Sequence, residues 1–180
     1  MPPIMEFIKE SPPGNWSSWD TLMDAALDQA RQAAQAEEIP VGAVLIDKEG
    51  LIIGQGYNQS ISRHDPTAHA EILAIRQGCQ NERNYRIPGS TLIVTLEPCI
   101  MCLGAIMHAR ISMVVFGAHD PKTGALGSRL LGNMLPWSNH AFQVVAGIRK
   151  QECSTLLTDF FRKRRQQHKS PTVAPSESPT

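Results

Sequence analysis

The sequence predicts an α/β fold, a three-layer α/β/α sandwich in which helices cover both faces of a mixed five-stranded sheet. Short apolar runs alternate with longer segments of helical periodicity along most of the chain. The first two runs are separated only by Lys48, Glu49 and Gly50, which is typical of a hairpin and makes that pair antiparallel. At 180 residues the chain is long enough to bury a core, and we expect one domain.

The first half of the chain is predicted to contain two helices and the hairpin. Ser17 and Asp20 have the spacing of a capping box at the start of the first helix, and Pro40 marks its end. In chain order, the predicted elements are a helix over 17–38, strands over 41–47 and 51–58, and a helix that begins within "PTAHAEILAIRQG", residues 66–78.

The second half is predicted to contain three strands and two helices. Pro98 suits the first turn of the helix that follows the third strand. Glycines and prolines between residues 118 and 140 indicate long loops with a helical turn. The predicted elements are strands over 90–96, 113–118 and 141–147, and helices over 98–110 and 149–167.

Both ends of the chain differ in composition from the part between them. Residues 1–16 are rich in proline and show little periodicity, so we expect a flexible extension. Residues 169–180 are polar and rich in proline, so we expect a disordered tail. The folded domain is therefore predicted to span residues 17–168.

The composition is that of a globular protein, with 42% hydrophobic residues, 19% charged residues and a formal net charge of zero. No run of eighteen apolar residues predicts a membrane span. The amino end lacks the apolar centre of a secretory signal, so we expect a cytoplasmic protein. In that reducing compartment the four cysteines are expected to be metal ligands or free thiols.

Cys99 and Cys102 form a C-x-x-C pair at the start of a predicted helix. Residues three apart share one helix face, so both sulfurs can reach one ion. The positive amino end of a helix also favours thiolate over thiol. A C-x-x-C that follows a strand and opens a helix equally describes a thioredoxin-like redox pair, so this motif alone leaves both interpretations open.

His69 favours the metal interpretation. One histidine and two cysteines form a known catalytic zinc arrangement that leaves the fourth position for water. Cys79 and Cys153 each stand alone in a helical pattern, where a small buried hydrophobe is the expected role. We therefore predict one Zn²⁺ per chain.

Glu71 lies two residues beyond His69, close enough to take a proton from a zinc-activated water without binding the metal. The alternative is an acid that only complements the helix dipole, which leaves the cysteine pair unexplained. "HAE" followed thirty residues later by "PCIMC" matches the H-x-E and P-C-x-x-C signature of zinc nucleobase deaminases.

The similarity extends beyond this signature, from about Trp19 to Gln167. The chain resembles the bacterial tRNA-specific adenosine deaminases, a branch of the cytidine and deoxycytidylate deaminase superfamily. The segments that carry the resemblance are "IPVGAVLID", "GYNQSISRHDPTAHAEILAIRQG", "NYRIPGSTLIVTLEPCIMCLGAIMHARI", "VVFGAHDPKTGALGS" and "DFFRKRRQ".

The resemblance implies a cytidine deaminase-like fold, a homodimer, and conversion of the wobble adenosine of a tRNA anticodon to inosine. It implies that zinc is bound by His69, Cys99 and Cys102, and that Glu71 shuttles protons. It implies that Asn58 contacts the target nucleoside, and that Asp120, Lys122 and Phe161 contact the anticodon loop. Two features depart from the family: His119 stands where arginine is frequent, and "RLLGNMLPWSNH" differs from the expected loop.

The helix end "FFRKRRQQHK" offers basic and aromatic side chains to RNA, although a solvated helix face explains the same composition. Three rival functions stay open. A small-molecule deaminase would share the zinc motif, a zinc-stabilised RNA-binding module would not need Glu71, and a dithiol redox protein would not need His69.

Overall fold

The computed structural model describes residues 12–167, and the predicted tail 169–180 and residues 1–11 of the predicted extension lie outside this range. Of that extension, residues 12–16 are described, and the Trp16 indole N–H donates to the Gly50 carbonyl at 2.8 Å. Within residues 12–167, no helix combines the length and the apolar character needed to cross a bilayer.

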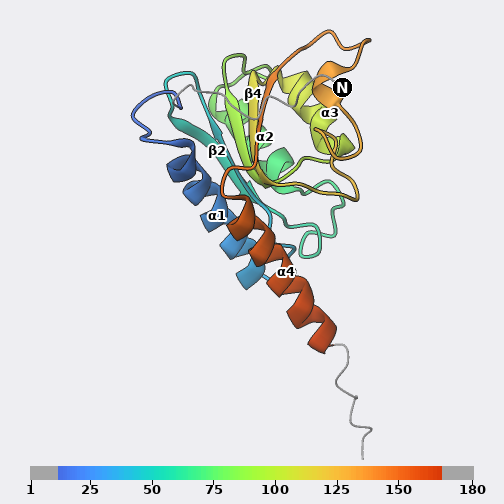
Figure 1. The fold of residues 1–180 in the computed structure, drawn as a ribbon. Coiled ribbons are helices and arrows are strands. Elements are labelled where there is room, and N and C mark those ends of the chain that lie inside the picture. Colours follow the sequence, from blue (N-terminus) through green and yellow to red (C-terminus); the bar gives the residue numbers. More distant parts are fainter. Residues whose placement is uncertain (1–11, 168–180) are drawn as a thin grey trace, which may run out of the picture.

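The predicted sandwich is confirmed, with a mixed sheet of strand order β2-β1-β3-β4-β5 (Figure 1). The strands are β1 Gly42–Ile46, β2 Ile52–Tyr57, β3 Thr91–Leu96, β4 Met113–Ala118 and β5 Gln143–Ala146. The helices are α1 Trp19–Gln35, α2 Ala70–Asn81, α3 Ile100–Ala109 and α4 Lys150–Gln167, with a 3₁₀ turn, η1, at Gly132–Met134. Strand β1 is antiparallel to both β2 and β3, whereas β3, β4 and β5 are parallel.

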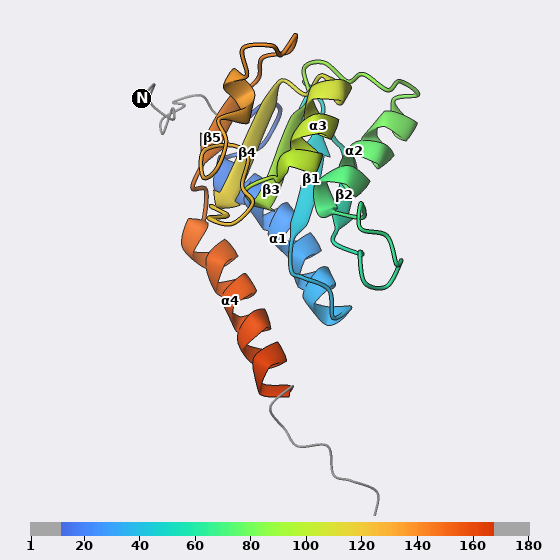
Figure 2. The same ribbon diagram turned by 90° about the vertical axis from the view of Figure 1, so that its right-hand side faces the viewer.

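Helices α1 and α4 cover one face of the sheet, and α2 and α3 cover the other (Figure 2). Alternate residues of each central strand pack into the two cores, one on each face of the sheet. In β3, Leu92 and Val94 join the core beneath α2 and α3, while Ile93 joins the core beneath α1. Burial on both faces explains why the strand reads as an unbroken apolar run instead of an alternating one.

Helix α1 begins one residue later than its capping pattern predicted. Ser18 is the N-cap, its hydroxyl accepts the Thr21 N–H at 3.3 Å, and the Thr21 hydroxyl oxygen accepts the Ser18 N–H. The predicted Ser17–Asp20 box is therefore wrong, because a start at Trp19 turns that buried indole towards the sheet. Pro98 likewise precedes the N-cap Cys99 and is not in the first turn of α3.

The topology brings several chain segments to one edge of the sheet. The carboxyl ends of β3 and β4 lie together, since Leu96 pairs with Ala118. Because β1 is antiparallel to β3 and β2, its start at Gly42 pairs with the end of β2 at Tyr57, at the same edge. The segments after β2, β3 and β4 and the segment before β1 consequently meet there, and α4 extends past this edge (Figure 2). Open α/β sheets bind ligands outside the carboxyl ends of their strands.

Candidate active site

His69, Cys99 and Cys102 meet at this edge and form a triangle of ligand atoms. His69 Nδ1 lies 3.7 Å from Cys99 Sγ and 3.6 Å from Cys102 Sγ, and the two sulfurs are 3.7 Å apart. Zinc bonds of about 2.3 Å to sulfur and about 2.0–2.1 Å to nitrogen, at tetrahedral angles, give edges of about 3.8 Å and about 3.6 Å. The triangle therefore has the dimensions of three corners of a zinc tetrahedron, and its residues fit the metal.

Two of these residues occupy the N-cap positions of helices. His69 is the N-cap of α2 and Cys99 is the N-cap of α3, and neither side chain makes a capping hydrogen bond. Ser, Thr, Asp or Asn is usual at such a position, and their replacement costs about 0.5–2 kcal/mol. Both helices thus give up a local stabilising contact, and their free side chains point to a common ligand.

The sulfurs lie in an environment that stabilises thiolate. The hydrogen bond between the Cys99 and Cys102 sulfurs lowers the pKa of Cys99 to about 4. The same hydrogen bond raises the pKa of Cys102, and burial adds to this effect. The Cys99 sulfur also raises the pKa of His69. A divalent cation bound between the sulfurs favours thiolate at both of them.

Glu71 lies in the first turn of α2 and lines the same pocket as His69 and Cys99. Only 4% of the residue is exposed, and this burial raises the pKa of its carboxyl. A buried acid with a raised pKa can accept a proton and return it. The sequence predicted this residue as the catalytic acid–base, and the structure places it where that chemistry is possible.

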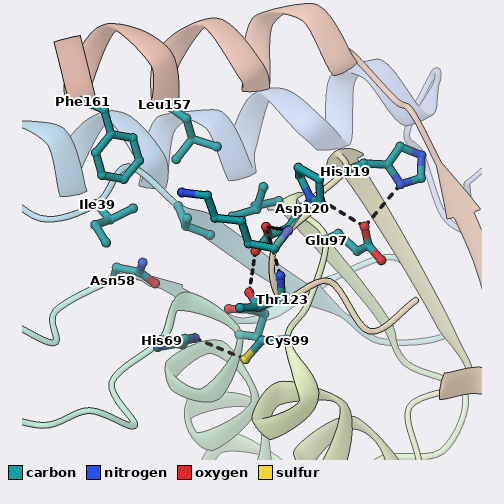
Figure 3. Close-up of a pocket in the computed structure, with 15 residues that line it drawn as sticks. Ile39, Asn58, His69, Glu97, Cys99, His119, Asp120, Thr123, Leu157 and Phe161 are labelled. Atoms are coloured by element: carbon teal, nitrogen blue, oxygen red, sulfur yellow. Dashed lines mark hydrogen bonds and ion pairs between the residues drawn. The ribbon is translucent and has the colours of Figure 1, made fainter. Parts of the chain in front are cut away.

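The pocket beside the triangle has a volume of about 360 Å³, large enough for one nucleobase. Its walls combine apolar side chains with a polar rim (Figure 3). Ile39, Leu157 and Phe161 form the apolar wall, and Asn58, Asp120, Lys122 and Thr123 contribute polar groups. All the substrate-contact residues predicted from the sequence therefore line one cavity.

Asn58 follows β2 and is 8% exposed. Its Oδ1 accepts the Ala70 N–H at 2.9 Å, which satisfies a free donor at the start of α2 where His69 makes no cap. This bond fixes the orientation of the amide. The two donors on Nδ2 remain to bind an acceptor in the pocket.

Asp120 and Lys122 follow β4 and lie at the pocket rim. Asp120 Oδ1 accepts the Lys122 N–H at 2.9 Å, and its Oδ2 accepts the Thr123 hydroxyl at 2.6 Å. Burial opposes ionisation of Asp120, but the hydrogen bonds from Thr123 and Lys122 outweigh it and lower the pKa of the carboxyl. Asp120 consequently shapes its own turn, whereas Lys122 is exposed.

Sequence reasoning missed two buried acids next to the pocket. Glu97 lies directly after β3, and Glu38 lies between α1 and β1, where it accepts the N–H groups of Ile61 and Ser62 at 3.1 and 2.7 Å. Glu97 could have been noticed, because a charged residue that ends an unbroken apolar strand needs partners. The apolar wall residues Ile39 and Leu157 have no feature in the sequence that would mark them as pocket residues.

His119, which replaces the family's frequent arginine, is turned towards the protein. Its Nδ1 lies 3.2 Å from Glu97 Oε2, and its ring packs edge-on against Phe116 with a centroid distance of 5.1 Å. The imidazole thus contacts a buried carboxylate directly after β3.

Comparison with known proteins identifies the family. Residues 17–118 match the family model described as the cytidine and deoxycytidylate deaminase zinc-binding region. The chain is 53% identical to a tRNA-specific adenosine deaminase of Haemophilus influenzae over 150 residues, covering 83% of this chain and 87% of that one. The chain belongs to the tRNA-specific adenosine deaminase family. The predicted family, the deaminase fold and the zinc cofactor are thereby confirmed.

Solved structures agree with this membership of the tRNA-specific adenosine deaminases. A structure from a study of A-to-I editing by tRNA:A34 deaminases at the wobble position has a TM-score of 0.73 and 42% identity, and covers 76% of this chain and 99% of that chain. A guanine deaminase from Nitrosomonas europaea has a TM-score of 0.68 at 22% identity, covering 89% of this chain and 93% of that one. At that identity the guanine deaminase shows the shared fold alone.

Loss of one corner of the triangle should release the metal. Cys102→Ser is expected to reduce bound zinc from one per chain to a small fraction, because the hydroxyl is a far weaker ligand than a thiolate. Cys79→Ser is the matched control, since Cys79 lies outside the triangle. Metal content of the purified variants, measured by mass spectrometry, tests this. Full zinc occupancy in Cys102→Ser and in Cys99→Ser would refute the assignment.

Two substitutions of Asn58 should separate its roles. Asn58→Ala leaves the Ala70 N–H without its acceptor and should lower the free energy of unfolding by about 1–3 kcal/mol. Asn58→Asp retains an acceptor at the helix amino end but loses the amide donors. We expect Asn58→Asp to unfold at a urea concentration closer to that of the wild type and still to lose activity. Equal activity of Asn58→Asp and the wild type would exclude a donor role.

Proposed function

We infer that the chain catalyses zinc-dependent hydrolytic deamination of adenosine to inosine at the wobble position of a tRNA anticodon. The observation that carries this inference is the zinc-sized triangle with a buried carboxyl beside it, in a pocket that fits one base. The family relatives named tRNA-specific adenosine deaminase support the choice of base and of RNA. We propose a cytoplasmic location as well, because reducing conditions keep the ligand cysteines unpaired.

We propose that His69, Cys99 and Cys102 hold the zinc. When bound there, the metal supplies Lewis-acid activation of a water molecule. Two of the three ligand residues, His69 and Cys99, are fixed in place as the N-caps of α2 and α3. The backbone N–H groups at a helix amino end favour anionic sulfur.

Glu71 moves the protons in this mechanism. Its carboxylate accepts the proton that the attacking water loses and delivers it to N1 of the adenine ring. Attack at C6 then produces a tetrahedral carbon, and Glu71 transfers the second water proton to the amino group, which leaves as ammonia. The sum is adenosine plus water giving inosine plus ammonia. The low exposure of Glu71 excludes bulk water that would compete for these protons.

Asn58 and the apolar wall orient the base. The amide donors of Asn58 can bind an acceptor on the nucleoside, because its oxygen is already used by Ala70. Phe161, which is 43% exposed, offers a ring face at the mouth of the pocket, near Leu157 and Ile39 (Figure 3). An anticodon loop presents unpaired bases, so moving one into the pocket costs little compared with a duplex base.

Phosphate contacts come from Lys122 and the end of α4. The arginines there differ in availability. Arg162 pairs with Asp159 at 2.9 Å, and Arg164 lies over the Phe160 ring at 5.6 Å. Arg165 is exposed and forms no ion pair with any residue of the range 12–167. We therefore propose Lys122 and Arg165 as the main phosphate contacts, with Phe161 stacking on a neighbouring base.

We also propose that the chain forms a homodimer. Its support is a set of exposed apolar side chains at the start of α3 and in segment 131–137, namely Ile100, Leu131, Met134 and Trp137, with exposed fractions of 39–74%. The first turns of α3 and segment 131–134 lie together, since a Cβ on Gly132 would be 2.3 Å from Leu103 Cδ2. A second copy of the same apolar surface would remove it from water.

Replacement of Glu71 should separate chemistry from folding. Glu71→Gln is expected to keep one zinc per chain and to lose activity by about 10²–10⁴-fold, the range typical of general acid–base catalysis. Inosine formation under single-turnover conditions, alongside metal content, is the measurement. Glu49→Gln, on the hairpin at the opposite edge of the sheet, is the control. Near wild-type turnover in Glu71→Gln would refute the proton-transfer role of Glu71.

Substrate choice tests the proposed function directly. We expect inosine from a short anticodon stem-loop with a wobble adenosine, and far lower kcat/KM for free adenosine, cytidine or guanine. Phe161→Ala should weaken stem-loop binding by about 1–3 kcal/mol, the usual cost of losing one stacked base. Comparable kcat/KM for free cytidine or guanine and for the stem-loop would establish a small-molecule deaminase.

The dimer has its own measurement. Trp137→Ser combined with Met134→Ser should shift the sedimentation-derived mass from two chains to one, because polar side chains would then occupy the proposed interface. Leu51→Ser, an exposed apolar residue on the hairpin, should leave the mass unchanged. A monomeric wild type at micromolar concentration would rule out the proposal.

A further inference from the structure

Glu97 is a buried carboxylate that the proposed chemistry does not use. It directly follows β3, two residues before Cys99, and is 2% exposed. Its Oε1 accepts the N–H groups of Leu126 and Ser128, both at 2.9 Å. Its Oε2 accepts the Asp120 N–H at 3.0 Å and the Ser128 hydroxyl, and lies 3.2 Å from His119 Nδ1.

All these partners belong to one segment, residues 119–128, which we call the pocket loop. The pocket loop also carries Lys122 and Thr123, which line the pocket. Glu97 also lines the pocket, and Figure 3 shows its carboxylate beside Asp120 and His119, with dashed lines that join it to both. One side chain therefore fixes both ends of a loop that forms one wall of the pocket.

The pocket loop also lies directly against the turn that holds two ligand residues. The Ala125 N–H donates to the Pro98 carbonyl at 2.8 Å, and Cys99 and Gly124 form an isolated β-bridge. This approach requires glycine at position 124. A Cβ there would lie 2.4 Å from Glu97 Cδ and 2.5 Å from its Oε2, which no side chain can occupy.

The bonding of Glu97 argues against a role in proton transfer. Its two oxygens accept four N–H or O–H donors and contact the His119 ring, so they have no capacity left for a water in the pocket. Glu71, by contrast, is buried and faces the cavity beside the ligand triangle. The two acids therefore have different functions.

We propose that Glu97 is a positioning residue for the RNA substrate, which it serves by holding the pocket loop in the shape that brings Asp120, Lys122 and Thr123 to the rim. The proposal rests on the proposed function. Glu97 acts through the loop and touches neither the base nor the reacting atoms. Its removal should thus impair substrate binding more than the rate of the bound complex.

Glu97→Gln tests the proposal because an amide keeps the shape of the side chain. One of its oxygens becomes an NH₂ group, which must face donors from the pocket loop and repel them. We expect KM for the stem-loop to rise about tenfold or more, since small misplacements of binding groups have large effects. The single-turnover rate at saturating RNA should stay within about threefold of wild type, and zinc should remain at one per chain.

Two other variants complete the experiment. Gly124→Ala displaces the same loop from the opposite side and should reproduce the rise in KM. Asp47→Asn is the matched control, because Asp47 Oδ1 accepts the N–H groups of Glu49 and Leu51 in the hairpin turn at the far edge of the sheet. It should leave KM unchanged. If Glu97→Gln does not fold, Ser128→Ala, which removes only the hydroxyl donor, decides in the same assay.

Two results would overturn the proposal. One is an unchanged KM in zinc-loaded Glu97→Gln. The other is a fall in the saturated single-turnover rate with KM unchanged, which would place Glu97 at the reacting atoms. The proposed function fails separately, through absence of inosine in the wild-type reaction. In that case, binding of fluorescently labelled stem-loop to the wild type and to Glu97→Gln still measures the role of the loop.

Discussion

Helices α2 and α3 begin close to each other, and the arrangement of the other elements depends on keeping these two helix starts together. The amino ends of α2 and α3 converge, and each presents a ligand where a capping side chain would normally be. The amino end of each helix carries a partial positive charge, so the two ends would repel each other without the anionic sulfur and the carboxyl that lie nearby. The antiparallel placement of β1 and the parallel placement of β3 and β4 bring the two helix starts to one edge. The side-chain oxygen of Asn58 then accepts the Ala70 N–H, for which His69 makes no capping bond.

Two buried acids, Glu71 and Glu97, line the pocket, and a third, Glu38, directly precedes the lining residue Ile39. The partners of each acid decide what it can do. Glu97 and Glu38 accept hydrogen bonds from loop donors, which keep the pKa of each carboxyl below its ordinary value although burial opposes this. Glu71 is governed by burial, and the pKa of its carboxyl is raised. Glutamate is therefore held as a hydrogen-bonded anion in two places, whereas the raised pKa of Glu71 suits the proton transfer that we propose for it. Glu97 holds the loop that carries Asp120, and Glu38 holds the backbone at Ile61 and Ser62.

Most of the fold was predictable because its signals are local. Strand β4 was predicted to the residue, since an apolar run buried on both faces has sharp polar boundaries, and the hairpin followed from the turn at Gly50. Spacing within two motifs brought His69, Glu71 and Cys99 to notice, and their assigned roles stay predictions. The capping residue of α1 was misplaced because Ser17 and Ser18 are equivalent in sequence and only packing of Trp19 distinguishes them. Glu97 and Glu38 were missed because their partners lie more than twenty residues away.

The bonds of Glu97 have a consequence for how this family can change. Of the four hydrogen bonds that Glu97 accepts from N–H and O–H donors, three come from the main chain, at Asp120, Leu126 and Ser128. A main-chain N–H is the same whichever side chain the residue carries. Apart from Gly124 and from Asp120, whose carboxylate shapes its own turn, the pocket loop can therefore exchange the side chains that face the substrate while its path stays fixed. Single substitutions in the pocket loop can therefore change substrate specificity while the loop backbone keeps its path. The positions of His69, Cys99 and Cys102 need not change with them.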